Sequence, residues 1–274
     1  LVNIAKNNGI TVMDTCKVNE VEFDNDGFNL KTQQGVFFSK ICCGSFGKKS
    51  NLDVKWKRSF LAGSNNKLNN LVAVKYHVKA AADPGTITLH NFKDGYCGFS
   101  KVDDDRYCLC YLTNAANLAS ANHSVSDMEQ QILYRNPMLK ELFTTVTPLY
   151  HEPLTISQVS FAQKSIIEDH VLMMGDAAGM ITPLCGNGMS MAMHAGKLAA
   201  EQIDLFLQQK ISRQIMEQQY TMAWRKNFSR RLWVGRQIQR LFGKPVATEI
   251  FLSVMKQLPA LTRKIIGLTH GKPF

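Results

Sequence analysis

The chain has 274 residues and a mass of 30.8 kDa, and 45% of its residues are hydrophobic while 20% are charged. These proportions are typical of a globular protein with a buried core, so disorder is not the default expectation. No run of about eighteen apolar residues occurs, which excludes a membrane-spanning helix. The first residues lack the charged leader and apolar stretch of a signal peptide. Because no start methionine is present, we expect the chain to begin inside a larger reading frame or after processing.

The net charge of +10 is concentrated in the last quarter of the chain. Residues 1–210 hold 20 Lys+Arg and 20 Asp+Glu, whereas residues 211–274 hold 12 Lys+Arg against only Glu217 and Glu249. Such a shift in composition predicts a separate, basic C-terminal element.

The cysteines argue against a metal or disulfide framework. There are seven of them, and no Cys-x-x-Cys pair occurs. Neither the adjacent pair Cys42 and Cys43 nor the spacing of Cys108 and Cys110 suits a zinc site or a disulfide scaffold. The sequence therefore predicts no metal, and reduced, mostly buried thiols in a cytoplasmic protein.

The first forty residues read as a helix, a strand and a small β-meander. A helix stopped by Gly9 precedes a short buried strand at 10–13. Strand patterns follow at 18–23, 28–32 and 36–43, and the first two are joined by the turn sequence Asp24-Asn25-Asp26-Gly27. Asn, Asp and Gly tolerate the positive φ that a tight hairpin needs.

The middle of the chain reads as an antiparallel sheet with small helices. The run from Gly63 to Asn70 is rich in Gly, Ser and Asn, so we expect a domain crossing there. Strands are predicted at 72–78, 86–92, 95–102 and 106–112, and a further strand at 154–163. A capping box at Ser126 to Glu129 predicts the start of one helix, and Pro137 the start of another.

The last hundred residues read as a short strand followed by helices. An apolar run at 170–174 predicts a buried strand that ends at Gly175-Asp176. Long helices are predicted at 188–209 and 213–242, with one or two more around Pro259. The 188–209 helix carries a face of small residues, which allows close packing on a sheet.

The segment between strand and helix carries the chemical signal. A carboxylate, Asp176, follows the strand directly, and a loop with Pro183, Gly186 and Gly188 leads into the helix. Glycines allow backbone N–H groups to approach a ligand, and a helix N-terminus favours an anion or a developing negative charge. A carboxylate at the end of such a strand is suited to hold ligand hydroxyls.

The ordered pattern Gly-Asp-Ala-Ala-Gly, Pro, Gly-x-Gly and small-residue helix resembles a flavin motif. It is the second flavin motif of FAD-dependent oxidoreductases in the p-hydroxybenzoate hydroxylase and geranylgeranyl reductase superfamily. The resemblance implies that Asp176 holds the ribityl chain of FAD and that the proline loop lines the flavin ring. The cofactor-binding residues implied in this way are Gly175, Asp176, Pro183, Gly186, Asn187, Gly188 and Met189.

Two departures from the family pattern bear on the cofactor. The loop from Gly44 to Ser50 keeps three residues of another motif of the family, but Phe46 stands where an aspartate is usual. This departure puts the NAD(P)H role of the loop in doubt. The family's N-terminal Gly-x-Gly-x-x-Gly, which seats the ADP half of FAD, is absent. We therefore expect a βαβ unit before Leu1. The tryptophan motif of flavin halogenases is also missing, so halogenation is not expected.

The resemblance implies an α/β fold with a Rossmann-like FAD/NAD(P)-binding domain, an inserted antiparallel β-sheet substrate domain and a helical C-terminus. The predicted divisions are 1–58 and 166–210 for the FAD-binding domain, 59–165 for the substrate domain and 211–274 for the basic helical region.

The implied function is an FAD-dependent oxidoreductase acting on an apolar or aromatic small molecule. Gly179 follows Asp-Ala-Ala, where hydroxylases of the family more often have histidine, so a geranylgeranyl-reductase-like reductase is favoured. A flavin-dependent monooxygenase is the alternative, and a non-enzymatic basic binding module is the alternative of another class. The sequence leaves open whether NAD(P)H is the reductant.

Other residues are weaker candidates for a functional role. His170 and His194 flank the flavin motif and are candidate proton donors, although packed or solvated histidines are commoner. Cys185 is read as a small loop residue rather than a reactive thiol. The predicted helix at 213–242 is read as a docked helix with a solvated basic face. The alternative is contact with an anionic membrane at its inner face. Nucleic-acid binding is not expected, because no nucleic-acid fold signature occurs.

Overall fold

The computed structural model describes residues 2–62, 70–270 and 274. The helices are α1 (Val2–Asn7), α2 (Asn51–Lys55), α3 (Ala115–Ser120), α4 (Val125–Gln131), α5 (Pro137–Thr145), α6 (Gly188–Leu207), α7 (Arg213–Gln239), α8 (Pro245–Gln257) and α9 (Pro259–His270). The strands are β1 (Val18–Asp24), β2 (Gly27–Thr32), β3 (Gly35–Ser39), β4 (Cys43–Gly44), β5 (Leu71–Lys79), β6 (Thr88–Phe92), β7 (Gly95–Asp103), β8 (Arg106–Asn114), β9 (Thr147–Pro148), β10 (Leu154–Val159), β11 (Ile167–Glu168) and β12 (Val171–Met173). Short 3-10 turns cover Ser59–Leu61, Leu133–Arg135, Gly175–Ala177 and Pro183–Cys185.

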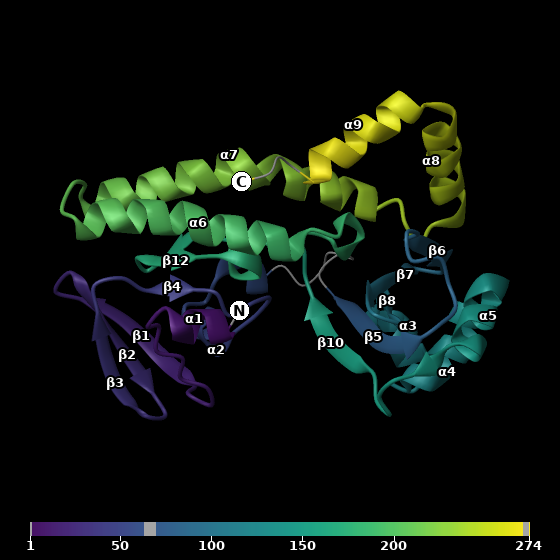
Figure 1. Ribbon diagram of the computed structural model, residues 1–274, viewed down its shortest axis with the longest axis horizontal. Helices are drawn as coiled ribbons and strands as arrows, with labels where there is room; N and C mark the ends of the chain where they lie inside the picture. The colour runs from purple at the N-terminus through teal and green to yellow at the C-terminus, as the bar shows by residue number, and fades with distance from the viewer. Residues whose placement is uncertain (1, 63–69, 271–273) are drawn as a thin grey trace.

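Figure 1 shows the arrangement of these elements. Helices α6 and α7 lie side by side over β4 and β12, with the β1–β2–β3 meander on the other side of these strands. The larger sheet and its covering helices α3, α4 and α5 form the other half of the molecule. The predicted α/β class, with an inserted antiparallel sheet and a helical C-terminus, is confirmed.

The meander forms as the sequence predicts. Asn25 and Asp26 have φ of 48° and 58°, which is the left-handed conformation that a two-residue hairpin turn requires. The turn sets the register in which Asp24 faces Gly27 and Phe23 faces Phe28. Phe28 is fully buried in the core beneath the meander.

Two strand predictions near the N-terminus are wrong. Residues 10–13 form no strand, and Ile10 is 58% exposed, because its backbone N–H bonds Ala5 O at the end of α1 instead. The predicted strand 36–43 is divided in two. Ser39 Oγ bonds the carbonyl of Ile41, and the chain leaves the meander there. It then forms β4, which pairs in parallel with β12.

The larger sheet has the strand order β10-β5-β8-β7-β6, with β9 paired to β5. Its core side packs on α4 and α5 through residues such as Tyr111, Met128 and Leu139. Helix α4 starts two residues earlier than the predicted capping box, because Ser124 rather than Ser126 caps it by accepting from Asp127 N at 3.2 Å. Pro137 begins α5 as predicted.

The sheet lies wholly within residues 59–165. The predicted crossing at Gly63 to Asn70 lies outside the described residues apart from Asn70, and the domain boundaries remain a prediction.

Helix α7 is docked by its apolar side. The side chains that recur every four residues along it are all buried, and Tyr220 Oη donates to Met173 O in β12 at 2.6 Å. The buried residues of this stripe are Met216, Tyr220, Trp224, Phe228 and Leu232. The docked-helix interpretation is therefore confirmed for this face, while Arg225, Lys226 and Arg230 remain exposed on the other.

The C-terminal helices connect back to both halves of the molecule. Between α7 and α8, Gly243 O accepts a hydrogen bond from Asp94 N in the β6–β7 turn at 3.0 Å. Helix α9 then returns to pack against α7. In the described part of the chain, no helix is both long and apolar enough to cross a bilayer.

All seven cysteines are free thiols. The prediction that most of them are buried is wrong, because only Cys97 and Cys185 are buried and Cys43 is exposed. Several of them lie on strands whose outer faces are only partly covered.

Candidate functional site

The site begins at the carboxyl end of β12, where the chain turns sharply. Met174 N bonds Gly44 O at 2.9 Å, which joins the end of β12 to the end of β4. The turn Gly175–Ala177 follows at once, and Ala178 N and Gly179 N both bond Gly175 O. Residues from two parallel strand ends therefore meet at this point.

A buried arginine holds this turn in place through hydrogen bonds. Arg58 Nη1 donates to Asp53 Oδ1 at 2.7 Å, and both side chains are 0% exposed. The same guanidinium donates to Ala177 O at 3.1 Å and to Ser165 O at 2.7 Å. Because a buried charge needs a partner, this pair ties α2 to the turn. The sequence analysis missed Arg58, although the spacing Ser50-x-x-Asp53 is a capping-box pattern that the structure forms.

A buried lysine supports the turn from the other side. Lys164 Nζ donates to Asp176 O and to Lys48 O, each at 2.7 Å, and lies 4.5 Å from the centre of the Phe60 ring. Burial lowers the pKa of Lys164 to about 8. Among the described residues, it forms no ion pair with a carboxylate. No local sequence signal distinguishes Lys164 from a surface lysine, so the sequence analysis missed it.

The carboxylate of Asp176 is left available for a ligand. No described donor bonds it, although its backbone carbonyl is held by Lys164. Burial raises the pKa of Asp176, while the nearby Lys164 ammonium opposes that shift. A desolvated carboxylate without donors is a strong acceptor for hydroxyl groups.

The proline loop is rigidly folded. Pro183–Cys185 forms a 3-10 turn that ends at Gly186, whose φ of 67° is a left-handed conformation that glycine adopts without strain. Cys185 is buried beside Thr182, and burial raises the pKa of its thiol. A neutral, buried thiol agrees with the reading of Cys185 as a structural residue.

Helix α6 begins without a side-chain cap. Asn187 occupies the N-cap position, but its Nδ2 donates to Thr269 O in α9, and its Oδ1 is buried without a partner in the described structure. The first backbone N–H groups of a helix have no intrahelical acceptor. The amides at the start of α6 are therefore free to bind an acceptor, and they carry the positive end of the helix dipole.

The predicted site residues are only partly brought together. Gly175, Asp176 and Gly188 line one hollow of about 10 Å³, together with Met191 and Trp224 of the covering helices. Pro183 and Gly186 lie at the exposed surface of the loop outside it. Met189 is 84% exposed, so its side chain points to solvent.

The two candidate histidines are packed elsewhere. His170 precedes β12, at the end opposite Gly175, where its Nδ1 lies 2.9 Å from Glu217 Oε1 and its ring contacts Phe23. His194 is buried in α6 and stacks on Phe274 with a centroid distance of 4.3 Å. Neither histidine lines the hollow at Asp176.

The chain resembles solved flavoproteins over most of its length. The flavin-dependent brominase Bmp2 superposes with a TM-score of 0.73 and 18% identity, covering 97% of this chain and 67% of that protein. HpxO of Klebsiella pneumoniae, solved with FAD and uric acid, gives a TM-score of 0.71 and 16% identity, covering 92% and 66%. The flavin-dependent halogenase CmlS gives 0.68 and 20%, covering 84% of this chain and 43% of that protein.

Sequence comparison reaches curated proteins over a shorter stretch. An uncharacterized protein of Methanocaldococcus jannaschii is 28% identical over 116 residues, which is 42% of this chain and 28% of that protein. Conditioned medium factor receptor 1 of Dictyostelium discoideum is 27% identical over 139 residues, which is 49% of this chain and 26% of that protein. The chain thus spans between a quarter and a third of these two relatives. No protein-family model matches it.

The neighbours agree with the architecture described above. Each superposition covers 84% or more of this chain. The chain therefore has the fold of these solved flavoproteins.

Proposed function

We propose that this chain is part of an FAD-dependent oxidoreductase and that the flavin binds across the Asp176 turn and the start of α6. The observation that carries this proposal is the uncapped α6 N-terminus. Asn187 could cap the helix, but its side chain is engaged by Thr269. Gly188, at the start of α6, lines the same hollow as Asp176, whose carboxylate no described donor bonds. Acceptor and donors therefore stand side by side, as a cofactor with both hydroxyl and carbonyl groups requires.

The residues fit FAD in a specific way. Asp176 would accept hydrogen bonds from the ribityl hydroxyls, and the amides of Gly188 and Met189 would donate to the N1–C2 carbonyl edge of the flavin ring. Pro183, Gly186 and Asn187 would line the same edge, with Gly175 in the turn. The hollow of about 10 Å³ is far too small for a flavin, so the ring would lie across its mouth. When bound, FAD supplies two-electron transfer, and the α6 dipole would stabilise its anionic reduced form.

The ADP half of the cofactor needs more than this chain presents. Among the described strands, β4 is paired only with β12, so its outer edge is open. Beside that edge lies a hollow of about 340 Å³, lined by Cys42, Phe46 and Trp56 among others. On α6, Met189 and Met193 are exposed. We propose that a further β-strand and its helix complete the sheet here and carry the dinucleotide-binding glycines.

The substrate class and the direction of electron flow are the finer part of the proposal. Neighbours with this fold are solved with uric acid and with 2-aminobenzoylacetate, which supports a small aromatic or apolar substrate. Gly179 favours a reductase, but a Cβ there would lie 3.0 Å from Leu232 Cδ1 and 3.2 Å from Trp224, so helix packing is a second reason for this glycine. NAD(P)H remains a proposed reductant.

A flavin titration and an oxygen measurement test these proposals in order. With the proposed strand and helix beside β4 present, the purified protein should bind FAD with saturable quenching of flavin fluorescence. A basic binding module would leave that fluorescence unchanged. With the flavin reduced, reoxidation by substrate under anaerobic conditions would identify a reductase. Reoxidation only with dioxygen and incorporation of an oxygen atom into product would identify a monooxygenase.

Contact with an anionic membrane is a separate proposal for the basic face of α7. Arg225, Lys226 and Arg230 are exposed there, and Val246 and Ile250 are exposed on the adjoining helix α8. Binding to acidic vesicles, measured by sedimentation, should be stronger than binding to neutral vesicles by about 1 kcal/mol per basic contact. This preference should fall as the salt concentration rises. Equal sedimentation with both vesicles at low salt would contradict it.

A further inference from the structure

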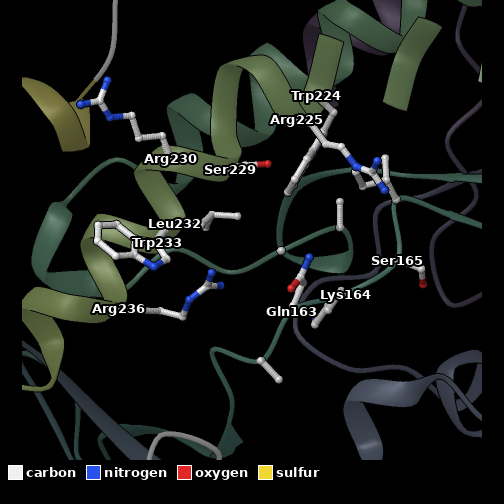
Figure 2. A pocket seen from close by; sticks show the side chains of 14 residues that line it. Gln163, Lys164, Ser165, Trp224, Arg225, Ser229, Arg230, Leu232, Trp233 and Arg236 are labelled. Atoms are coloured by element: carbon white, nitrogen blue, oxygen red, sulfur yellow. The ribbon is translucent and has the colours of Figure 1, made fainter. Parts of the chain in front are cut away.

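A cleft on the α7 side of the Asp176 turn has a lining that neither the fold nor the proposed flavin contacts explain. Its volume is about 440 Å³, which is within the range of small-molecule sites. One wall is α7 and the other is the segment 162–166, which leads into β11, with Ala178 and Gly179 between them (Figure 2).

The α7 wall of this cleft is aromatic and apolar. Trp224 and Leu232 are buried at its base, whereas Trp233 is 57% exposed at its side. A large exposed indole beside a concave surface gains area when a flat ligand covers it, and it offers a face for stacking. Ordinary core packing does not account for Trp233, because the ring lies outside the core.

The charged groups of the cleft are all cationic. Arg236 points into it in Figure 2, with Gln163 on the facing segment, whereas Arg230 extends away from its centre. Arg225 lies at the far rim. None of the described lining residues is acidic, and none of these arginines forms an ion pair within the described part of the chain.

Arg236 is the group on which the site depends. Its side chain is half-buried, and its only described hydrogen bond is a long one of 3.4 Å to Phe161 O. Burial lowers the pKa of Arg236, and Arg240 adds to that shift, although a guanidinium stays charged at neutral pH. A partly desolvated guanidinium without a carboxylate partner favours an oxyanion, which it can bind through two parallel hydrogen bonds.

We propose that this cleft binds a small aromatic oxyanion, with the ring against Trp224 and Trp233 and the carboxylate or phosphate group on Arg236. Gln163 would donate a further hydrogen bond to the same group. The assignment stands on the cleft itself and does not depend on flavin binding. Gly179 lines both this cleft and the hollow at Asp176, so a ligand here would touch the turn that carries Asp176.

The chain contains its own probe for the test. Two of its three tryptophans, Trp224 and Trp233, line the cleft, whereas Trp56 lines the hollow beside β4. The purified protein is titrated with benzoate, phenyl phosphate and the neutral benzamide, followed by tryptophan fluorescence and calorimetry. We expect at least one of the two anions to give a saturable signal and to bind about tenfold more tightly than benzamide. Trp233→Phe should remove most of the fluorescence change.

Arg236→Gln should weaken binding of the anion about tenfold, because it removes the charged partner while keeping an amide of similar reach. Arg263→Gln is the matched control, since it removes the same charge from the exposed surface of α9. Equal loss in both variants, or equal affinity for benzamide and both anions, would overturn the proposal. The proposal would also be overturned if the protein bound acidic vesicles but neither of the two soluble anions. Loss of flavin affinity together with anion affinity in Arg236→Gln would assign the cleft to the flavin and overturn it as well.

Discussion

The two sides of the Asp176 turn handle buried charge in opposite ways. On the closed side, Arg58 is paired with Asp53 and donates to carbonyls, so its charge is compensated within the protein. On the open side, Lys164 has carbonyl partners only, and Asp176 and the α6 amides have none among the described residues. The closed side is built for stability, and the open side leaves charges and donors for a ligand. Substitutions on the two sides should therefore have different effects.

The largest effect on stability is expected on the closed side. Arg58→Met leaves the Asp53 carboxylate buried without its partner, which should lower the free energy of unfolding by about 3–5 kcal/mol. Urea denaturation measures this change. The control is Lys55→Met, which breaks the exposed pair with Glu20 and should cost at most about 1 kcal/mol. If both variants lose the same small amount, the closed side has no special role.

The next effect is a pH dependence from Lys164. Its folded-state pKa of about 8 lies below the 10.5 of a free lysine, so the unfolded chain binds more protons between these values. Stability from this group therefore rises with pH from about 8 to 10.5. Relative to Lys164→Met, the wild type should gain up to about 3 kcal/mol across that window. Lys210→Met, which removes an exposed lysine, is the control. A stability difference between wild type and Lys164→Met that does not change with pH would contradict the assignment.

Substitution of Asp176 should weaken flavin binding without lowering stability. Asp176→Ala should weaken flavin affinity roughly ten- to a hundredfold, through loss of a charge-assisted hydrogen bond of about 1.5–3 kcal/mol. The variant should be as stable as the wild type or more stable, because burial raises the pKa of this carboxyl and so penalises its charged form. Flavin titration and thermal melting measure the two effects. Asp169→Ala, beyond the other end of β12, is the control, and equal dissociation constants for Asp176→Ala and wild type would exclude the ribityl role.

The smallest effect tests the amides of α6. A Cβ at Gly188 would meet only Ile181 at 3.8 Å, so Gly188→Val should fold. Its side chain should hold the ring away from the amides and remove about 1.4 kcal/mol of preference for the reduced flavin, which lowers a two-electron potential by about 30 mV. A dye-equilibrated redox titration measures this shift. Gly196→Val, on the same helix with open space around it, should leave the potential unchanged. An unchanged potential in flavin-loaded Gly188→Val would mean that α6 does not touch the redox edge.

Local signals predicted the open side better than the closed side. Strand, carboxylate, proline loop and helix start follow one another within residues 171–188, so their order was visible in the sequence. Arg58 and Lys164 reach the same turn from distant segments, and only the fold brings them there. The sequence also could not reveal that the Asn187 side chain is engaged by Thr269, because that contact spans 82 positions. Strand 10–13 failed for a related reason, since an apolar run forms a strand only where a partner edge is in reach.

Helix α7 has a mechanical consequence for how a substrate enters. At its first residue, Arg213 binds Asp26 of the meander at 2.6 Å, and just past its last turn Gly243 binds the hairpin at Asp94. Its 27 residues make a rod of about 40 Å, anchored to one sheet at each end. A rod anchored in this way resists any hinge motion that would swing the two sheets apart. We therefore expect substrates to be admitted by local movement of surface loops, while the distance between the two sheets stays fixed.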